Sequence, residues 1–142
     1  MSRRAGLVVA AFILGTGTQA VSAAPPPGGG AITDEVIAKW YTKTFLICAE
    51  EHPDENDGFA DCERQEAIRQ KAILKNVYSK TISRLSGAAK EKLEKSQRQW
   101  LADGLNTCKD QASQKKNDPD FSYPGCTVDE TIRRSIWVQS YR

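Results

Sequence analysis

Four cysteines and an N-terminal export signal place the strongest limits on what this chain can fold into. The chain begins with Ser2-Arg3-Arg4, continues with an apolar run over residues 5–14, and then carries small residues that lead to Val21-Ser22-Ala23. This order of basic, apolar and small residues is typical of a secretory signal peptide and predicts that residues 1–23 are removed. The cysteines all follow that segment: Cys48, Cys62, Cys108 and Cys126. An even number of cysteines in a small exported domain indicates disulfides, so we expect the protein in the periplasm or secreted.

Four cysteines allow three pairings. We favour Cys48–Cys62 and Cys108–Cys126, because each pair closes a loop between two helices that follow one another in the sequence. Closing a loop of about 15 residues, as in the first pair, contributes about 3 kcal/mol in the chain-entropy model. A zinc site is the alternative use of these cysteines. It is disfavoured because the sequence has no Cys-x-x-Cys and only one histidine, His52, so we expect no metal and no cofactor.

The rest of the chain is expected to form one domain behind a flexible leader. Residues 24–32 are rich in proline and glycine, and the folded domain is expected over residues 33–142. The whole chain has 20 basic and 18 acidic residues, and removal of Arg3 and Arg4 leaves 18 of each. A neutral protein is a poor general ligand for nucleic acid or anionic membranes. The apolar run of the signal is too short to span a bilayer comfortably, so we expect no stable membrane insertion after cleavage. An uncleaved anchor is the weaker alternative.

Apolar residues recur with the helical period through this domain, and no segment shows the convincing alternation of a β-strand. The sequence therefore predicts an all-α fold, a small bundle of about four helices with two disulfides. The expected helices cover residues 33–51, about 60–86, about 88 to beyond 108, and 127–141. Trp100 is the largest apolar side chain on its face of the third helix and is the expected centre of the core. Gly104, in the same helix, is expected either to admit a close neighbour or to mark a bend.

Breaker and cap residues set the expected ends of these helices. Pro53 is expected to end the first helix near Glu51. Thr127 and Glu130 have the spacing of a capping box, so the last helix is expected to begin at Thr127. The segment 115–126 before it contains two turn signals with proline and is expected to be a loop.

The sequence contains no recognisable catalytic site, and we expect that the protein is not an enzyme. A nucleophile needs an adjacent base, but His52 is the only histidine and stands in an acidic loop without a nucleophile motif. The segment Asp54–Gly58 resembles the start of a calcium loop, but its glycine falls at position five, whereas an EF-hand requires glycine at position six. No catalytic, cofactor-binding or metal-binding residues are therefore assigned.

Acidic residues gather around the segment between the first two cysteines and form an almost continuous negative block. The block comprises Glu50, Glu51, Asp54, Glu55, Asp57, Asp61 and Glu63. A disulfide between Cys48 and Cys62 would hold this loop on a rigid base and lower the entropy lost on docking. Such a surface suits a basic partner by electrostatic complementarity. The simpler alternative is that these charges only keep a connecting loop soluble.

Three motifs stand between Cys62 and Arg134. The first is Ser96-Gln97-Arg98-Gln99-Trp100-Leu101 followed by Cys108, the second is Leu74 with Tyr78, and the third is Cys126 with Thr131-x-x-Arg134. Together they resemble the LprI-type lysozyme-inhibitor family, whose usual motifs are Ala-Gln-Arg-x-Trp-x before a cysteine, Leu-Asn-x-x-Tyr, and a cysteine before Thr-x-x-Arg. Lys75 stands where the family usually has asparagine, and Asp103-Gly104-Leu105 stands where it usually has Tyr-Arg-Asp.

The resemblance implies an exported binding protein that inhibits lysozyme by blocking its cleft. Lysozyme works with two carboxylates in a sugar-binding cleft, and common c-type lysozymes are basic. The expected contact residues are Glu50, Glu51, His52, Asp54, Glu55 and Asp57, with His52 placed to reach a cleft carboxylate. A structural role is expected for Gln97, Arg98, Trp100, Thr131 and Arg134, the polar ones forming a brace between the last two helices. The alternative function is a helical envelope module that binds another envelope protein.

Overall fold

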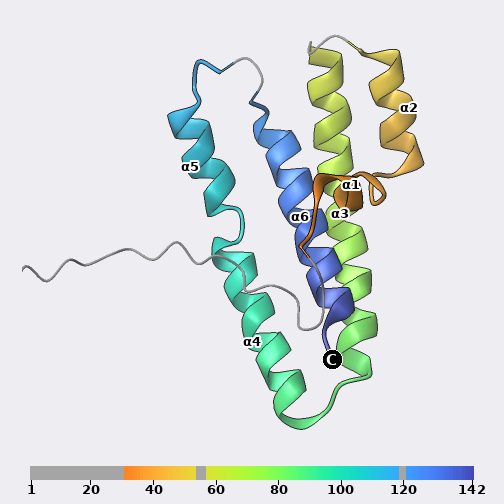
Figure 1. The fold of residues 1–142 in the computed structure, drawn as a ribbon, viewed down its shortest axis with the longest axis vertical. Coiled ribbons are helices and arrows are strands. Elements are labelled where there is room, and N and C mark those ends of the chain that lie inside the picture. The colour runs from red at the N-terminus through yellow and green to blue at the C-terminus, as the bar shows by residue number, and fades with distance from the viewer. Residues whose placement is uncertain (1–30, 54–56, 119–120) are drawn as a thin grey trace, which may run out of the picture.

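A computed structural model describes residues 31–53, 57–118 and 121–142 (Figure 1). Within these segments the secondary structure is helical and no β-strand occurs, which confirms the expected all-α class. The helices are α1 (Asp34–Ala38), α2 (Lys43–Glu51), α3 (Asp57–Ser83), α4 (Gly87–Asp103), α5 (Asn106–Gln114) and α6 (Tyr123–Ser140). The expected signal peptide and residues 24–30 of the leader lie outside the described residues, as do Asp54 and Glu55.

Helices α3 and α6 form the centre of the fold. They lie side by side and make the most extensive contact between two helices in the described part of the chain (Figure 1). Helix α2 packs on α3, and the short helix α1 lies against α6. Helices α4 and α5 follow one another along the other side of the pair, with α5 against α6. None of the described helices is long and apolar enough to cross a membrane.

Two apolar clusters hold these helices together. The first joins α1, α3 and α6 through Ile37, Ala67, Val128 and Ile132. The second joins α3, α4 and α6 through Leu74, Leu93 and Val138. Trp100 packs against the second cluster as a half-buried side chain, so the expectation that it forms the centre of the core is wrong. Ile32, expected in the flexible leader, packs against the first cluster, and its carbonyl oxygen accepts a 2.8 Å hydrogen bond from Arg133.

The segment expected as one helix over residues 33–51 is two helices, α1 and α2, separated by residues 39–42. The break occurs because Thr42 is the N-cap of α2, and its hydroxyl oxygen accepts a 3.2 Å hydrogen bond from the Phe45 N–H. The backbone N–H and hydroxyl of Thr42 donate in turn to the carboxylate of Glu66 on α3, at 2.9 and 2.5 Å. A partner far away in the sequence therefore stabilises the interruption, and hydrophobic periodicity could not reveal it.

The helix expected from residue 88 to beyond 108 is likewise divided, into α4 and α5, at Gly104 and Leu105. A bend at Gly104 was one of the two alternatives that the sequence left open, and the structure contains it. Gly104 also admits a close neighbour, which was the other alternative. A Cβ built at this position would lie 2.5 Å from Cδ1 and Nε1 of Trp100. The indole ring occupies the space that a side chain at position 104 would need.

The last helix begins at Tyr123 and not at the expected Thr127. Its N-cap is Ser122, whose hydroxyl oxygen accepts a 3.1 Å hydrogen bond from the Gly125 N–H and donates to the buried carboxylate of Glu63 on α3. The Thr127 hydroxyl bonds within α6, to the carbonyl oxygen of Tyr123, and so does not act as a cap. The capping-box prediction and the end of the expected loop are therefore wrong, because proline and glycine here form the first turn of a helix.

Both expected disulfides are confirmed. Cys48–Cys62 joins α2 to α3, with the two Cα atoms 5.8 Å apart, and Cys108–Cys126 joins α5 to α6, with a corresponding distance of 5.7 Å. Both distances are ordinary for disulfides. Each bond connects a peripheral helix to the central α3–α6 pair, so the two peripheral helices are covalently fixed to the centre of the fold.

Candidate partner-binding surface

The expected acidic surface is only partly assembled. Glu50 and Glu51 lie exposed in the last turn of α2, and His52, also exposed, is its C-cap. Asp57 is the first residue of α3, while Asp54 and Glu55 lie outside the described residues. Asp61 is exposed and forms a 3.4 Å ion pair with Arg64 one turn further along α3.

Glu63 does not belong to this surface. Its side chain is 7% exposed and is bonded to the N-cap of α6, at the end of a helix where a negative charge is favourable. The negative block that is continuous in sequence is therefore divided in space. The Glu63 carboxylate stabilises the fold, whereas Glu50 and Glu51 are exposed to a partner.

An apolar patch lies beside the acidic residues of α2. Leu46 is 47% exposed and Ile47 is 45% exposed, one turn before Glu50 and Glu51 on the outer face of the helix. Sequence reasoning missed these two residues because it followed the side chains that face inward, Phe45 among them. The signal was present, since Phe45-Leu-Ile-Cys48 is a run of four apolar residues and one buried face of a helix cannot cover all of them.

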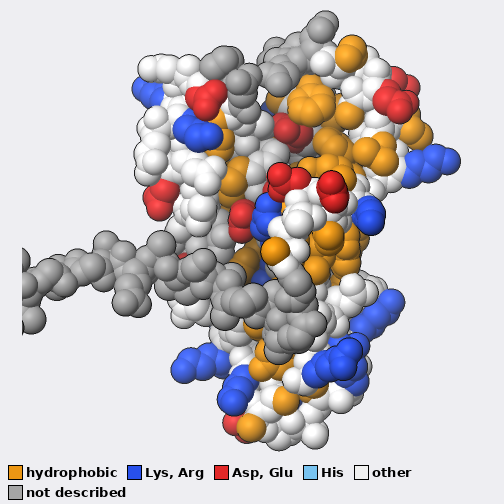
Figure 2. Space-filling model, in the orientation of Figure 1, with side chains coloured by type: hydrophobic (Ala, Val, Ile, Leu, Met, Phe, Trp, Pro, Cys, Tyr) orange, Lys and Arg blue, Asp and Glu red, His pale blue; other side chains and the backbone are white. Residues whose placement is uncertain are grey.

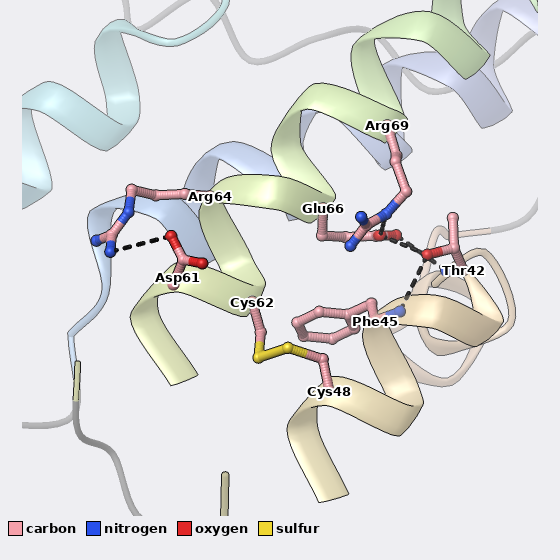
Figure 3. Close-up of a disulfide and its surroundings, with 8 residues drawn as sticks. All are labelled: Thr42, Phe45, Cys48, Asp61, Cys62, Arg64, Glu66 and Arg69. Atoms are coloured by element: carbon pink, nitrogen blue, oxygen red, sulfur yellow. Dashed lines mark hydrogen bonds and ion pairs between the residues drawn. A yellow bond between two sulfur atoms is a disulfide. The ribbon is translucent and has the colours of Figure 1, made fainter. Parts of the chain in front are cut away.

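Several contacts fix α2, which carries the patch, to the rest of the fold. Figure 3 shows the Cys48–Cys62 disulfide, the Phe45 ring and the contact of Thr42 with Glu66. On the inner side of α2, Phe45 is buried, with its ring centroid 5.0 Å from that of Tyr41 and 6.3 Å from that of Phe59. The Cys48–Cys62 disulfide holds the middle of the helix, and the Thr42–Glu66 hydrogen bonds hold its beginning. The arrangement presents a preformed surface of two apolar side chains bordered by carboxylates.

Residues 48–139 match the family model described as Lysozyme inhibitor LprI. The chain belongs to the LprI family. This match confirms the family that the three motifs suggested, and the family's description is that of an inhibitor and not of an enzyme. No curated protein and no solved structure matches the chain.

Two of the polar LprI motif residues meet between α4 and α6. Arg134 is 7% exposed, and its guanidinium donates to the Gln97 side-chain oxygen at 3.0 Å and to the Ser96 hydroxyl at 3.1 Å. The same guanidinium lies 4.3 Å from the ring centroid of Trp137 and 5.9 Å from that of Trp100. Burial lowers the pKa of Arg134 to about 10, so the side chain remains charged at neutral pH. A buried charge needs hydrogen-bond acceptors and ring contacts, and Gln97, Ser96 and the two tryptophans supply them.

The other two polar LprI motif residues lie outside this contact. Thr131 is buried, but its hydroxyl donates to the carbonyl oxygen of Thr127 in its own helix. Arg98 is exposed on α4. The brace between α4 and α6 therefore consists of Gln97, Ser96 and Arg134. The spacing of the motif residues in the sequence could not show that Ser96 takes part in the brace and that Arg98 and Thr131 do not.

Replacing Arg134 by lysine should test this brace. Lysine keeps the charge but loses the planar fork that bonds Gln97 and Ser96 together and stacks on Trp137, so we expect a loss of about 1–2 kcal/mol in the free energy of unfolding. Chemical denaturation followed by circular dichroism measures the change. Arg98→Lys, at an exposed position of the same motif, is the matched control and should stay within about 0.5 kcal/mol of the wild type. Equal stability of the two variants would contradict the structural role of Arg134.

One group of potential metal ligands occurs among the described residues of this LprI protein. Side-chain ligand atoms of Cys48, His52 and Cys62 lie within 4.8 Å of one another. Both sulfur atoms are joined in a disulfide and so lack the thiolate form that binds zinc. The two cysteines of this group form a covalent link between α2 and α3.

Proposed function

We propose that the mature protein is an exported, non-catalytic inhibitor that binds lysozyme through the outer face of α2 and blocks the enzyme's cleft. Membership of the LprI family supports lysozyme as the target. The observation that carries the proposal is the rigid α2 surface, on which exposed Leu46 and Ile47 lie next to Glu50 and Glu51. The two disulfides are consistent with an oxidising compartment outside the cytoplasm.

The two kinds of side chain on this surface have different roles in the proposed complex. Leu46 and Ile47 supply apolar area that a partner can bury. A few well-packed residues at the centre of an interface usually carry most of the affinity, and we assign these two side chains to that position. The carboxylates of Glu50 and Glu51 attract a basic lysozyme, which mainly raises the association rate. His52, exposed at the end of α2, is placed at the edge of the surface, where it can meet a carboxylate of the cleft.

The decisive experiment is an inhibition titration of a basic c-type lysozyme with oxidised mature protein, read as the rate of peptidoglycan lysis. Ile47→Asp should weaken inhibition by about tenfold or more, because it places a charge in the buried centre of the proposed interface. Leu101→Asp replaces an equally large exposed apolar residue on α4 and is the matched control, expected to inhibit like the wild type. The α2 interface would be rejected if both variants inhibited equally well.

Reversal of the charges tests the electrostatic part separately. Glu50→Lys combined with Glu51→Lys should slow association several-fold at low ionic strength and much less at about 0.5 M salt, where screening is strong. Surface plasmon resonance against immobilised lysozyme measures both rate constants. An effect confined to the dissociation rate would show that the carboxylates do not steer the encounter.

A complete absence of inhibition at large molar excess, with both disulfides verified by mass spectrometry, would favour the alternative function of an envelope module with another protein partner. The observation in favour of that alternative is the departure at Asp103-Gly104-Leu105. There the chain ends α4 and turns, at the positions where the family usually carries Tyr-Arg-Asp.

A further inference from the structure

A groove with an apolar floor lies between α3 and α4. The two helices diverge from the turn that connects them (Figure 1), and the space between them has a volume of about 590 Å³. Its apolar lining consists of Leu74, Tyr78, Trp100, Leu101 and Leu105. Leu101 is 70% exposed, the largest value among the exposed large apolar side chains of the described residues. A soluble protein usually covers such a surface only when a ligand or partner is bound.

The rim of the groove is positively charged. Lys71 and Lys75 stand one turn apart on α3, and Arg98 faces them from α4, whereas Glu94 is the only carboxylate in the lining. Among the described residues none of these three cations has an ion pair or side-chain hydrogen bond. All three are exposed. Their charges are therefore available to an anion outside the chain.

The wider surroundings have the same sign, although the mature protein as a whole is expected to be neutral. Residues 70–100 include eight basic and two acidic residues. In Figure 2, Lys and Arg side chains gather at the lower end of the molecule, where α4 and the end of α3 lie. The potential around the groove thus favours an anionic occupant.

We propose that this groove binds an amphiphile with a single acyl chain and an anionic head group. The chain would lie along Leu74, Trp100 and Leu101, and the head group beside Lys71, Lys75 and Arg98. The volume lies within the usual range of small-molecule sites, about 300–1,000 Å³. Burial of the chain would supply the hydrophobic part of the affinity. This site is independent of the proposed lysozyme-binding surface on α2.

An acidic helix of a partner protein is the competing occupant, and its size makes it less suitable. On α3 the lining extends from Lys71 to Tyr78, a helical rise of about 10 Å. A helix segment of that length and of the usual 10–12 Å diameter occupies about 800–1,100 Å³. It would exceed the groove and leave part of its own apolar face uncovered, whereas a slender acyl chain fits inside.

Isothermal titration calorimetry of the mature, oxidised protein with dodecyl phosphate, below its critical micelle concentration, tests the proposal. We expect saturable binding of one molecule per chain. Dodecyl maltoside, which has the same chain and a neutral head group, and inorganic phosphate, which has no chain, should each bind at least about tenfold more weakly. Saturable binding of inorganic phosphate with equal affinity would identify a simple anion site and overturn the role of the chain.

Two pairs of variants locate the binding. Lys71→Glu with Lys75→Glu should weaken dodecyl phosphate binding by at least about tenfold. Lys90→Glu with Lys92→Glu, an equal charge change on exposed lysines of α4 outside the lining, should weaken it much less, because those charges act only through the general potential. Leu101→Asp should also weaken binding, and Ile47→Asp should leave it unchanged. Thermal unfolding confirms that each variant is folded.

Several results would overturn the proposal. They are an absence of binding, equal affinity for the maltoside, equal losses in the two lysine pairs, or displacement of dodecyl phosphate by an acidic amphipathic peptide that binds more tightly. Because Leu101→Asp is expected to retain lysozyme inhibition, and Ile47→Asp to retain amphiphile binding, failure of one proposal is distinguishable from failure of the other.

Discussion

Replacing Glu66 by alanine is expected to lower the free energy of unfolding by about 3 kcal/mol or more, measured by denaturant titration. The Glu66 side chain is fully buried and accepts hydrogen bonds from the Thr42 N–H and hydroxyl, from the Gln70 amide at 2.7 Å and from the Arg69 guanidinium at 2.8 Å. Alanine would leave these donors without their acceptor. It would also remove the contact that holds the beginning of α2 against α3.

The isosteric variant Glu66→Gln separates shape from charge. The single carbonyl oxygen of glutamine can still accept a hydrogen bond from Thr42 or Gln70. Its NH₂ group is a donor and would face other donors that the carboxylate of Glu66 accepts from, so we expect a loss of about 1–2 kcal/mol in the free energy of unfolding. If Glu66→Ala were as stable as Glu66→Gln, the hydrogen bonds at this site would not stabilise the turn between α1 and α2.

Acidification should reproduce part of this loss. Burial alone would raise the pKa of Glu66, but hydrogen bonds from Thr42, Gln70 and Arg69 outweigh it and lower the pKa below the ordinary value of 4.5. A lowered pKa in the folded state stabilises the protein above pH 4.5, and this contribution is lost as the pH falls through the folded-state pKa. The wild type should therefore lose stability below about pH 4.5 more steeply than Glu66→Gln.

The comparison with Glu66→Gln is needed because other carboxylates titrate in the same region. The pKa of Glu130 is raised, because burial and the nearby charge of Asp129 raise it by more than the charge of Arg133 lowers it. A raised pKa has the opposite effect on stability, since protonation of Glu130 on acidification relieves an unfavourable charge in the folded state. This contribution is common to the wild type and the variant, so the difference between their pH profiles isolates Glu66.

Removal of the Cys108–Cys126 disulfide is expected to have the second large effect. The double variant Cys108→Ser and Cys126→Ser should lose about 2–5 kcal/mol of stability, the usual cost of removing a native disulfide from a small domain. Cys108 is the only buried residue of α5, whose main contact with another helix is with α6. Without the covalent bond, α5 retains no apolar anchor, and we expect its amide protons to exchange rapidly while those of α3 and α6 remain protected.

The other disulfide provides the matched comparison. Removal of Cys48–Cys62 should leave α2 in place more effectively, because buried Phe45 and the Thr42–Glu66 hydrogen bonds still hold that helix. Hydrogen exchange followed by mass spectrometry compares the two variants. Retained protection of α5 in the Cys108/Cys126 variant would show that noncovalent contacts suffice to hold it.

The sequence was informative wherever the relevant signal is local. Helical periodicity predicted the all-α class, and α3 starts and ends within about three residues of its expected limits. The even number of cysteines indicated disulfides, and the pairing favoured among three, between cysteines close in the chain, is the one that the structure has. The motif around Trp100 and Arg134 indicated the LprI family, which the match over residues 48–139 confirmed.

The candidate surface was less predictable, because accessibility depends on packing. Residues 45–48 of α2 are all apolar, and contact with α3 determines that Phe45 is buried while Leu46 and Ile47 are exposed. Similarly, seven neighbouring acidic residues carry the same charge, and the position of α6 determines that Glu63 is buried.

Local sequence thus determined the helical class and the family and favoured one cysteine pairing, since each depends on residue types at short spacing. The places where α2 and α6 begin depended on tertiary contacts. Thr42 and Ser122 cap these helices while bonded to Glu66 and Glu63 of α3, which lie 24 and 59 residues away in the chain. A buried carboxylate must have donors to be stable, and the unpaired N–H groups and capping hydroxyls at a helix start supply them. Folding of the whole chain brings these groups together, so no window of neighbouring residues contains both.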